Sequence, residues 1–160
     1  MKGIGKISMT DVVLKEVNSK NNDLHELIFK LDNEMKERYP EEGIFGLDFN
    51  DPKVNEVVFV VAYINDYPVG CGGIRPLNSK SVELKRFYVD SKYRKKGIAS
   101  KILSSLECKA KNKGYSSIKL ETGPFQPESI ELYRKFGYAD IELYGEYLNS
   151  KYSLCFEKIL

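Results

Sequence analysis

A short run of cations ends on a glycine where a helical pattern starts, and these residues are suited to binding phosphate. Arg94, Lys95 and Lys96 precede Gly97, after which apolar residues recur at helical spacing, at Ile98, Ile102 and Leu106. The first amides of a helix lack internal partners and carry the positive end of the helix dipole, so they bind phosphate oxygens. The segment predicts a diphosphate site built from backbone amides. A charged turn before a solvated helix is the alternative.

Motifs for other phosphate ligands and for metals are absent from the sequence. There is no G-x-x-x-x-G-K-[ST] for a nucleoside triphosphate and no G-x-G-x-x-G for a dinucleotide. His25 is the only histidine and has no acidic or cysteine partner at metal spacing, so we expect no metal site. The three cysteines are odd in number and widely spaced, which fits no disulfide framework. We expect reduced thiols, with Cys71 and Cys108 as small core residues.

Length, charge and hydropathy limit the classes of function. A chain of 160 residues is the size of one ordinary domain, so we expect residues 1–160 to form a single domain. The net charge of +2 is too small for general attraction to nucleic acid, and we expect no such partner. The first residues lack the apolar core of a secretory signal, and the longest apolar run, Val57–Ile64, is too short to span a bilayer. We therefore expect a cytoplasmic protein without a membrane partner.

Three strands joined by tight turns lead to the cationic segment. They predict an antiparallel meander of Val57–Ile64, Val69–Arg75 and Val82–Val89. Ahead of the meander we expect a strand within Ile4–Val17 and an amphipathic helix that closes at Pro40. Between that helix and the meander, Glu41–Glu56 is predicted to be a loop or short helix. Its Phe45 and Phe49 either close over a ligand or anchor the loop.

Helices and strands alternate after the cationic segment. We expect two helices, Gly97–Gly114 and Pro127–Gly137, and three strands, Ser116–Thr122, about Asp140–Leu143, and Ser153–Lys158. One strand-helix-strand connection in this order is a parallel, right-handed crossover. The elements together predict an α/β domain with a mixed sheet.

Two motifs on elements of the expected type resemble those of a known family. RKKGIA at Arg94–Ala99 follows a strand that ends in FYVD and matches the pattern [RQ]-x-x-G-x-[GA]. ELYRKFGY at Glu131–Tyr138 looks like A-x-x-L-Y-x-[KR]-x-G-[FY]. From about Val57 onward the chain thus resembles the GNAT superfamily, the acyl-CoA-dependent N-acetyltransferases. The resemblance implies a single-domain GNAT-like fold with a mixed, mostly antiparallel sheet flanked by helices.

The resemblance also implies acetyl-CoA as acetyl donor and assigns residues to it. Besides Arg94 and Lys95, the loop would hold the pyrophosphate through the backbone amides of Lys96, Gly97, Ile98 and Ala99. The backbone of Phe87 and Val89 would pair with the acetyl and pantetheine groups. Gln126 stands where the family often has asparagine and would reach the pantetheine arm.

Two residues inherit catalytic roles from the resemblance, Tyr133 as general acid and Glu83 as general base. Acetyl transfer from a thioester to an amine needs a neutral amine, a stabilised oxyanion and a proton for the leaving sulfur. Without the resemblance, a tyrosine at helical spacing with apolar neighbours is more often a core residue. Glu83 has its own alternative, an exposed sheet-face glutamate paired with Lys85 or Arg75. A water chain is the other candidate for the base.

We therefore expect an N-acetyltransferase that acts by direct transfer from acetyl-CoA to a primary amine of a small molecule, such as an amino acid or a polyamine. The alternatives are a protein or peptide amino group as acceptor, and a non-catalytic acyl-CoA-binding regulatory module. Tyr144–Lys158 is aromatic and polar, and the resemblance implies that this part of the chain builds the acceptor wall. Arg75 or Arg86 would bind an acceptor carboxylate bidentately or lie at the surface. The resemblance to the family is the only reason to expect a homodimer.

Overall fold

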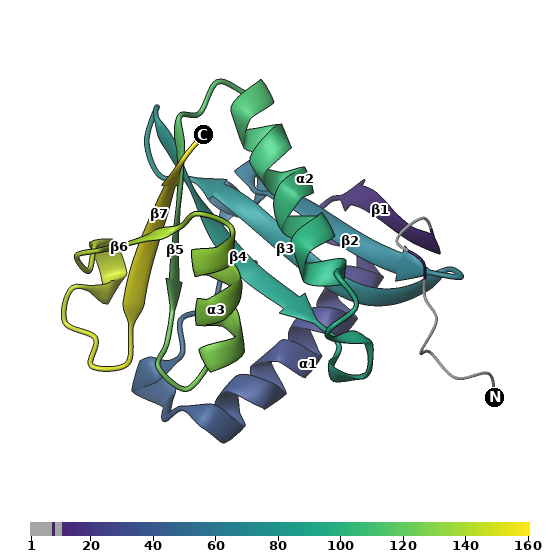
Figure 1. Ribbon diagram of the computed structural model, residues 1–160, viewed down its shortest axis with the longest axis horizontal. Helices are drawn as coiled ribbons and strands as arrows, with labels where there is room; N and C mark the ends of the chain where they lie inside the picture. The colour runs from purple at the N-terminus through teal and green to yellow at the C-terminus, as the bar shows by residue number, and fades with distance from the viewer. Residues whose placement is uncertain (1–7, 9–10) are drawn as a thin grey trace.

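The computed structural model of the protein describes Ser8 and residues 11–160, and it contains a seven-stranded sheet with helices on both faces (Figure 1). The strand order is β1-β2-β3-β4-β5-β7-β6. The strands are β1 Val12–Val17, β2 Val58–Ile64, β3 Tyr67–Pro76, β4 Ser81–Val89, β5 Ser117–Thr122, β6 Ala139–Ile141 and β7 Leu154–Ile159. Neighbouring strands are antiparallel except β4 and β5, which are parallel. The predicted mixed, mostly antiparallel sheet flanked by helices is confirmed.

The predicted meander is formed by β2, β3 and β4, and β1 pairs with the free edge of β2. A two-residue turn joins β2 to β3, and its residues Asn65 and Asp66 have φ angles of 50° and 63°. Hairpin turns of this length favour positive φ, which Asn and Asp tolerate better than most side chains. β3 therefore begins at Tyr67, two residues before the predicted start. β1 falls in the later part of the predicted range Ile4–Val17, whose earlier part lies outside the described residues.

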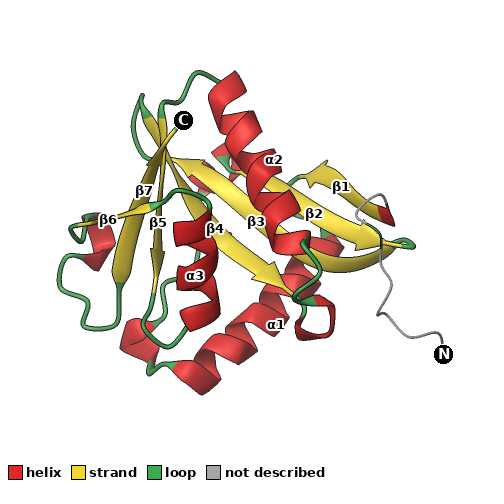
Figure 2. Ribbon diagram, in the orientation of Figure 1, coloured by secondary structure: helices red, strands yellow, loops and turns green. Residues whose placement is uncertain are grey.

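Three α-helices cover the sheet, and they are α1 Asn22–Arg38, α2 Ile98–Asn112 and α3 Pro127–Lys135. α2 and α3 pack on one face and α1 on the other (Figure 2). The side chain of Asn21 caps α1 by accepting a hydrogen bond from the Leu24 amide at 2.9 Å. Pro127 opens α3, where its missing N–H costs nothing. No helix in the described part of the chain is long and apolar enough to cross a bilayer.

The segment between α1 and β2 contains two short 3-10 helices, Glu41–Gly43 and Pro52–Glu56. Its two phenylalanines have different surroundings. Phe49 stacks on the buried ring of Phe59, with 5.7 Å between centroids. Phe45 meets the ring of Tyr147 edge-on at 4.9 Å and lines a cavity described below. Phe49 thus anchors the segment, and only Phe45 faces a ligand-sized space.

Two further predictions along the chain differ from the structure. The strand expected at about Asp140–Leu143 is β6, which ends at Ile141 and pairs only with β7. Cys108 is exposed, so its prediction as a core residue was wrong, whereas Cys71 is buried as expected. Cys108 lies two residues from the buried Leu106, and two residues are about half a helical turn. Cys108 therefore points away from the sheet.

β4 and β5 run side by side for only a short distance and then separate (Figure 1). Their pairing covers three positions, from Ser81 opposite Ser117 to Glu83 opposite Lys119. Beyond that point β4 pairs only with β3, and β5 pairs only with β7. The sheet thus opens between the carboxyl ends of two parallel strands, where ligands often bind in α/β folds.

The core on the α2 side generates a prediction about stability. Leu106 is fully buried in the cluster between α2 and the sheet, so Leu106→Ala should lower the free energy of unfolding by about 2–5 kcal/mol through lost burial and a new cavity. Leu148→Ala is the control, because Leu148 is 63% exposed and should change stability by no more than about 0.5 kcal/mol. Urea unfolding measures both values. Equal losses would show that α2 does not carry the core.

Candidate functional site

Two cavities meet where β4 and β5 separate. One is a groove of about 590 Å³ between the cationic loop and α3, and the other is a smaller cavity of about 90 Å³ that reaches toward α1. Both are lined by Leu31, Phe87, Gln126 and Ser129. An extended ligand in the groove therefore has one end at the small cavity. This arrangement suits a long cosubstrate whose reactive end meets a second, smaller molecule.

Most of the residues predicted to bind the cosubstrate line the groove. They are Phe87, Val89, Arg94, Lys95, Gly97, Ile98, Ala99 and Gln126. Lys96 belongs to the same loop but does not line the groove. The fold thus brings the end of β4, the loop, the start of α2 and the start of α3 around one space.

The start of α2 has the features of an anion site. Gly97 is the N-cap residue with a φ of 84°, and no side chain caps the helix. The first helical hydrogen bond runs from the Lys101 amide to the Gly97 carbonyl, so the amides of the first turn have no helical partner. Lys95 also has a positive φ, of 62°. Positive φ angles close together before a helix are typical of backbone turns whose amides bind phosphate oxygens.

The side chain of Arg94 holds the loop in place. Its Nε donates to the Val89 carbonyl at 2.8 Å, and its Nη2 lies 2.8 Å from a carboxylate oxygen of Glu34 in α1. Asp90 secures the other side of the loop by accepting from the Lys92 amide at 3.1 Å and pairing with Lys30 at 3.0 Å. Burial opposes ionisation of Asp90, but these hydrogen bonds keep its pKa below the ordinary value. The loop is therefore shaped before any ligand arrives.

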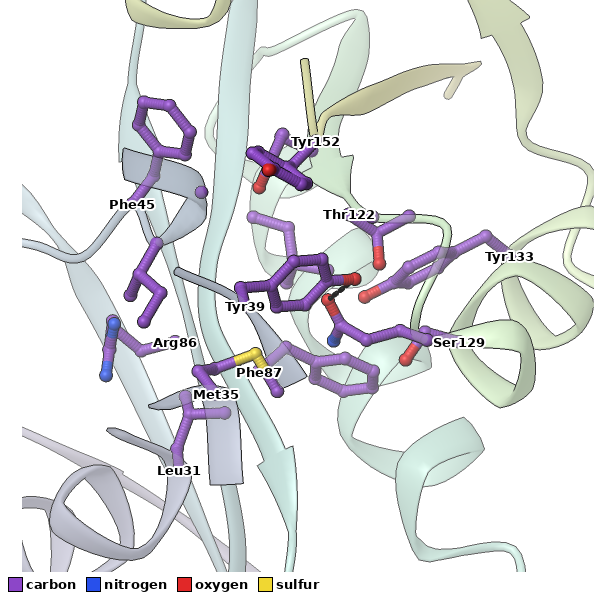
Figure 3. Close-up of a pocket in the computed structure, with 16 residues that line it drawn as sticks. Leu31, Met35, Tyr39, Phe45, Arg86, Phe87, Thr122, Ser129, Tyr133 and Tyr152 are labelled. Carbon is purple, nitrogen blue, oxygen red and sulfur yellow. Dashed lines mark hydrogen bonds between the residues drawn. The ribbon is translucent and has the colours of Figure 1, made fainter. Parts of the chain in front are cut away.

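Tyr133 lies at the wall of the small cavity. Figure 3 shows its hydroxyl pointing toward the hydroxyls of Tyr39 and Thr122 across the cavity. The ring packs against Phe87 and Phe156, with centroids 6.1 and 6.3 Å apart. Burial, and then the nearby charge of Glu121, raises the pKa of Tyr133. The hydroxyl therefore stays protonated near neutral pH and is available as a proton donor.

Glu83 is fully buried and lines neither cavity. Its Oε1 lies 2.6 Å from Nη2 of Arg75, and its Oε2 accepts a hydrogen bond from the Tyr144 hydroxyl at 2.5 Å. The sequence left open an exposed glutamate paired with Lys85 or Arg75; the structure shows the pairing with Arg75, but Glu83 is buried rather than exposed. Both carboxylate oxygens are thus engaged by neighbouring side chains.

Glu121, at the end of β5, is a functional candidate that the sequence reasoning missed. It lines the small cavity and accepts a hydrogen bond from the Ser153 hydroxyl at 2.6 Å. Burial raises the pKa of Glu121 to about 7, against the lowering effect of the Ser153 hydrogen bond. A carboxyl group that titrates near neutrality is suited to general base catalysis. The signal in the sequence is an acidic residue near a strand end, two residues before Gly123.

Tyr39, just after α1, holds the wall that the two cavities share. Its hydroxyl accepts a hydrogen bond from the Phe125 amide at 3.0 Å and donates to Oε1 of Gln126 at 3.3 Å. Gly123 permits this approach, because a Cβ there would lie 2.2 Å from the Tyr39 hydroxyl. Gln126 is therefore positioned by α1 as well as by its own loop.

The chain matches known sequences over most of its length. The family model for the acetyltransferase (GNAT) family matches residues 21–138. An IAA acetyltransferase from Azospirillum brasilense is 35% identical over 136 residues, which are 84% of this chain and 89% of the relative. The uncharacterized N-acetyltransferase YsnE from Bacillus subtilis is 30% identical over 111 residues, 68% of this chain and 73% of the relative.

Solved structures share the fold. A crystal structure from Klebsiella pneumoniae, described as that of an acyl-CoA N-acyltransferase, has a TM-score of 0.82 and 26% identity and covers 93% of this chain and 97% of its own. A GNAT family acetyltransferase from Elizabethkingia anophelis with acetyl-CoA bound has a TM-score of 0.71 and 18% identity, with coverage of 94% and 99%. Together these similarities define an acyl-CoA-dependent N-acetyltransferase. The chain belongs to the GNAT acetyltransferase family.

The loop geometry predicts different effects for two substitutions. Gly97→Val should weaken coenzyme A binding on the order of 100-fold, because a branched residue is strained at this φ and crowds the approach to the amides. Lys95→Ala should weaken it only about 2- to 5-fold, the effect of one exposed charge. Titration calorimetry with coenzyme A measures both.

Gly114→Val is the matched control for strain. Gly114 has a φ of 93° at the other end of α2, and a side chain there would meet no atom within 4 Å. This variant should lose some stability but keep its affinity for coenzyme A. Small, equal losses of affinity in the two loop variants would mean that the loop is only a charged turn.

Proposed function

We propose that the protein transfers the acetyl group of acetyl-CoA directly to a primary amine of a small molecule. One observation carries this proposal: the groove adjoins a small cavity, and both Tyr133 and Glu121 line that cavity. A proton acceptor and a proton donor thus face one space at the end of the groove. Direct acetyl transfer requires both.

The groove is suited to the donor. First-turn amides of α2, with Lys95 at the loop, would hold the pyrophosphate, and Arg94 would hold the loop. The backbone of Phe87 and Val89 at the end of β4 would pair with the acetyl and pantetheine groups, because this part of β4 has no strand neighbour on the β5 side. Relatives of the same fold contain acetyl-CoA and coenzyme A, which supports this placement.

Glu121 would accept the proton from the acceptor ammonium, directly or through a water, and leave a neutral amine. The amine nitrogen then attacks the thioester carbonyl, and an amide of β4 near Phe87 stabilises the oxyanion. As the carbon–sulfur bond breaks, Tyr133 donates its proton to the leaving thiolate, and the second proton of the former amine nitrogen passes, directly or through water, to the Tyr133 oxygen and restores the hydroxyl. The products are an N-acetylated amine and free coenzyme A. Glu83, the base expected from the sequence, is the alternative to Glu121.

The acceptor side favours a small molecule. The cavity of about 90 Å³ is a fraction of the groove, so it admits a small amine or the amine-bearing end of a larger one. Thiol release from acetyl-CoA across a panel of amines, amino acids and peptides tests the proposal. Turnover confined to peptides would favour the protein acceptor. Tight coenzyme A binding without turnover on any amine would favour a regulatory module.

Tyr133→Phe should lower kcat by about 10²- to 10⁴-fold, since it removes the proton donor for sulfur. The affinity for acetyl-CoA should change little, because the ring and its packing remain. Stopped assays of thiol release and a binding titration separate the two effects. Tyr115→Phe is the control, since Tyr115 packs against the same core cluster but lines neither cavity. An unchanged kcat in Tyr133→Phe would reduce this residue to a core tyrosine.

The pH profile distinguishes the two candidate bases. Only the deprotonated carboxylate accepts a proton, and the pKa of Glu121 is raised to about 7, so kcat should rise with pH through about 7 and then level off. Glu121→Gln should remove that rise and lower kcat by about 10²- to 10⁴-fold. Glu83→Gln is the matched comparison. Loss of the rise in Glu83→Gln alone would assign the base to Glu83.

A further inference from the structure

Arg86 is unusual in its backbone and in its surroundings. It lies in β4 with a φ of 53°, and the pairing of β4 with β3 shifts register between Cys71 and Gly73. Such a bulge redirects side chains at the end of a strand. Figure 3 shows the Arg86 side chain leaving β4 on the side away from Tyr133. Arg86 is nevertheless one of the residues that line the small cavity.

The guanidinium of Arg86 is buried, and only some of its N–H donors have hydrogen-bond partners. Its side chain is 5% exposed, and its Nη2 donates to the carboxylate of Asp32 in α1. Its Nε is buried and has no hydrogen-bond partner. Gly46 packs closely against Nη1, because a Cβ there would lie only 3.2 Å from that atom. A buried donor without a partner is rare and costly, so it points to a ligand that supplies an acceptor.

A second orphaned atom lines the same cavity. Among the buried side-chain polar atoms of the described residues, only Arg86 Nε and Thr122 Oγ1 lack a partner. Both residues line the small cavity, on the two strands that separate there. Two unsatisfied polar groups in one small space indicate a polar ligand rather than an apolar one.

The charges of the cavity indicate what that ligand carries. Among the described residues that line it, Arg86 is the only cation and Glu121 the only carboxylate. The other candidate of the sequence analysis, Arg75, lines neither cavity and pairs with Glu83 and Glu146. One cation and one carboxylate complement a molecule that has both an amine and an acid group.

We propose that the acceptor is a small amine that also carries a carboxylate, as amino acids do. Arg86 binds the carboxylate through a charge-assisted hydrogen bond from Nε, and Glu121 takes the proton from the amine. Asp32 competes with the ligand for the guanidinium, but its side chain is 42% exposed, so its own charge is well solvated. This inference rests on the proposed function, because it names the acceptor of that reaction.

Wild-type enzyme with paired acceptors gives the first test. Each pair contains an amino acid and its carboxamide, which share the amine and the side chain and differ in the acid group. The acid should be favoured in kcat/KM by about 10- to 100-fold, the worth of a hydrogen bond to a charged group. Most of this preference should lie in KM, because Arg86 binds the acceptor without touching the thioester.

Two variants assign the preference to Arg86. Arg86→Gln should reduce the ratio of kcat/KM between acid and amide toward one. Asp32→Asn frees the guanidinium and should lower KM for the acid more than for the amide. A purely structural ion pair would instead lower the melting temperature in both variants and leave the ratio unchanged, which would overturn the inference.

The outcomes separate this inference from the function on which it rests. Turnover with equal preference for acid and amide in the wild type would overturn the role of Arg86 and leave the transferase in place. No turnover with any amine, while coenzyme A still binds, would overturn the proposed function itself. A coenzyme A titration of each variant shows whether the groove is intact.

Discussion

The separation of β4 and β5 is the constraint on which the site depends. Two parallel strands that stayed paired to their ends would satisfy each other's backbone groups and leave no room between them. Here pairing stops after Glu83, and each strand continues beside a different neighbour. The part of β4 near Phe87 therefore has no strand neighbour on the β5 side. Tyr133 and Glu121 both line the small cavity at the opening between β4 and β5, whereas Glu83 lines neither cavity.

The opening is also where charge is buried. On the α1 side, Glu83 and Lys85 of β4 and Glu121 of β5 are all largely removed from water. Glu83 offsets this cost through Arg75 and Tyr144, and Lys85 donates to the Tyr147 hydroxyl at 3.0 Å. Burial also lowers the pKa of Lys85. Glu121, the one carboxylate that lines the small cavity, thus lies near charged groups that already have partners. Its pKa is raised because it is buried and no cation donates a hydrogen bond to it.

α1 acts as a frame for both cavities. Glu34 holds Arg94 and thereby the cationic loop, whereas Arg38 donates to the Phe125 carbonyl at 2.9 Å. Tyr39, at the end of the helix, positions Gln126 on the shared wall. These contacts join segments some 60 to 90 residues apart. A rigid frame of this kind keeps reacting groups oriented, which is a large part of catalysis by proximity.

The features that the sequence determined by itself are local ones. The apolar spacing from Ile98 to Leu106, the Asn65-Asp66 turn and Gly97 each act on their own neighbours in the chain, so helix, hairpin and anion loop were predictable. The site depended on contacts between distant segments. Only the tertiary structure showed that Glu83 forms an ion pair with Arg75 and that Glu121 lines the small cavity. It also showed that Nε of Arg86 has no hydrogen-bond partner. Burial and hydrogen-bond partners set the pKa and availability of a side chain, and neither exists until the strands have paired and separated.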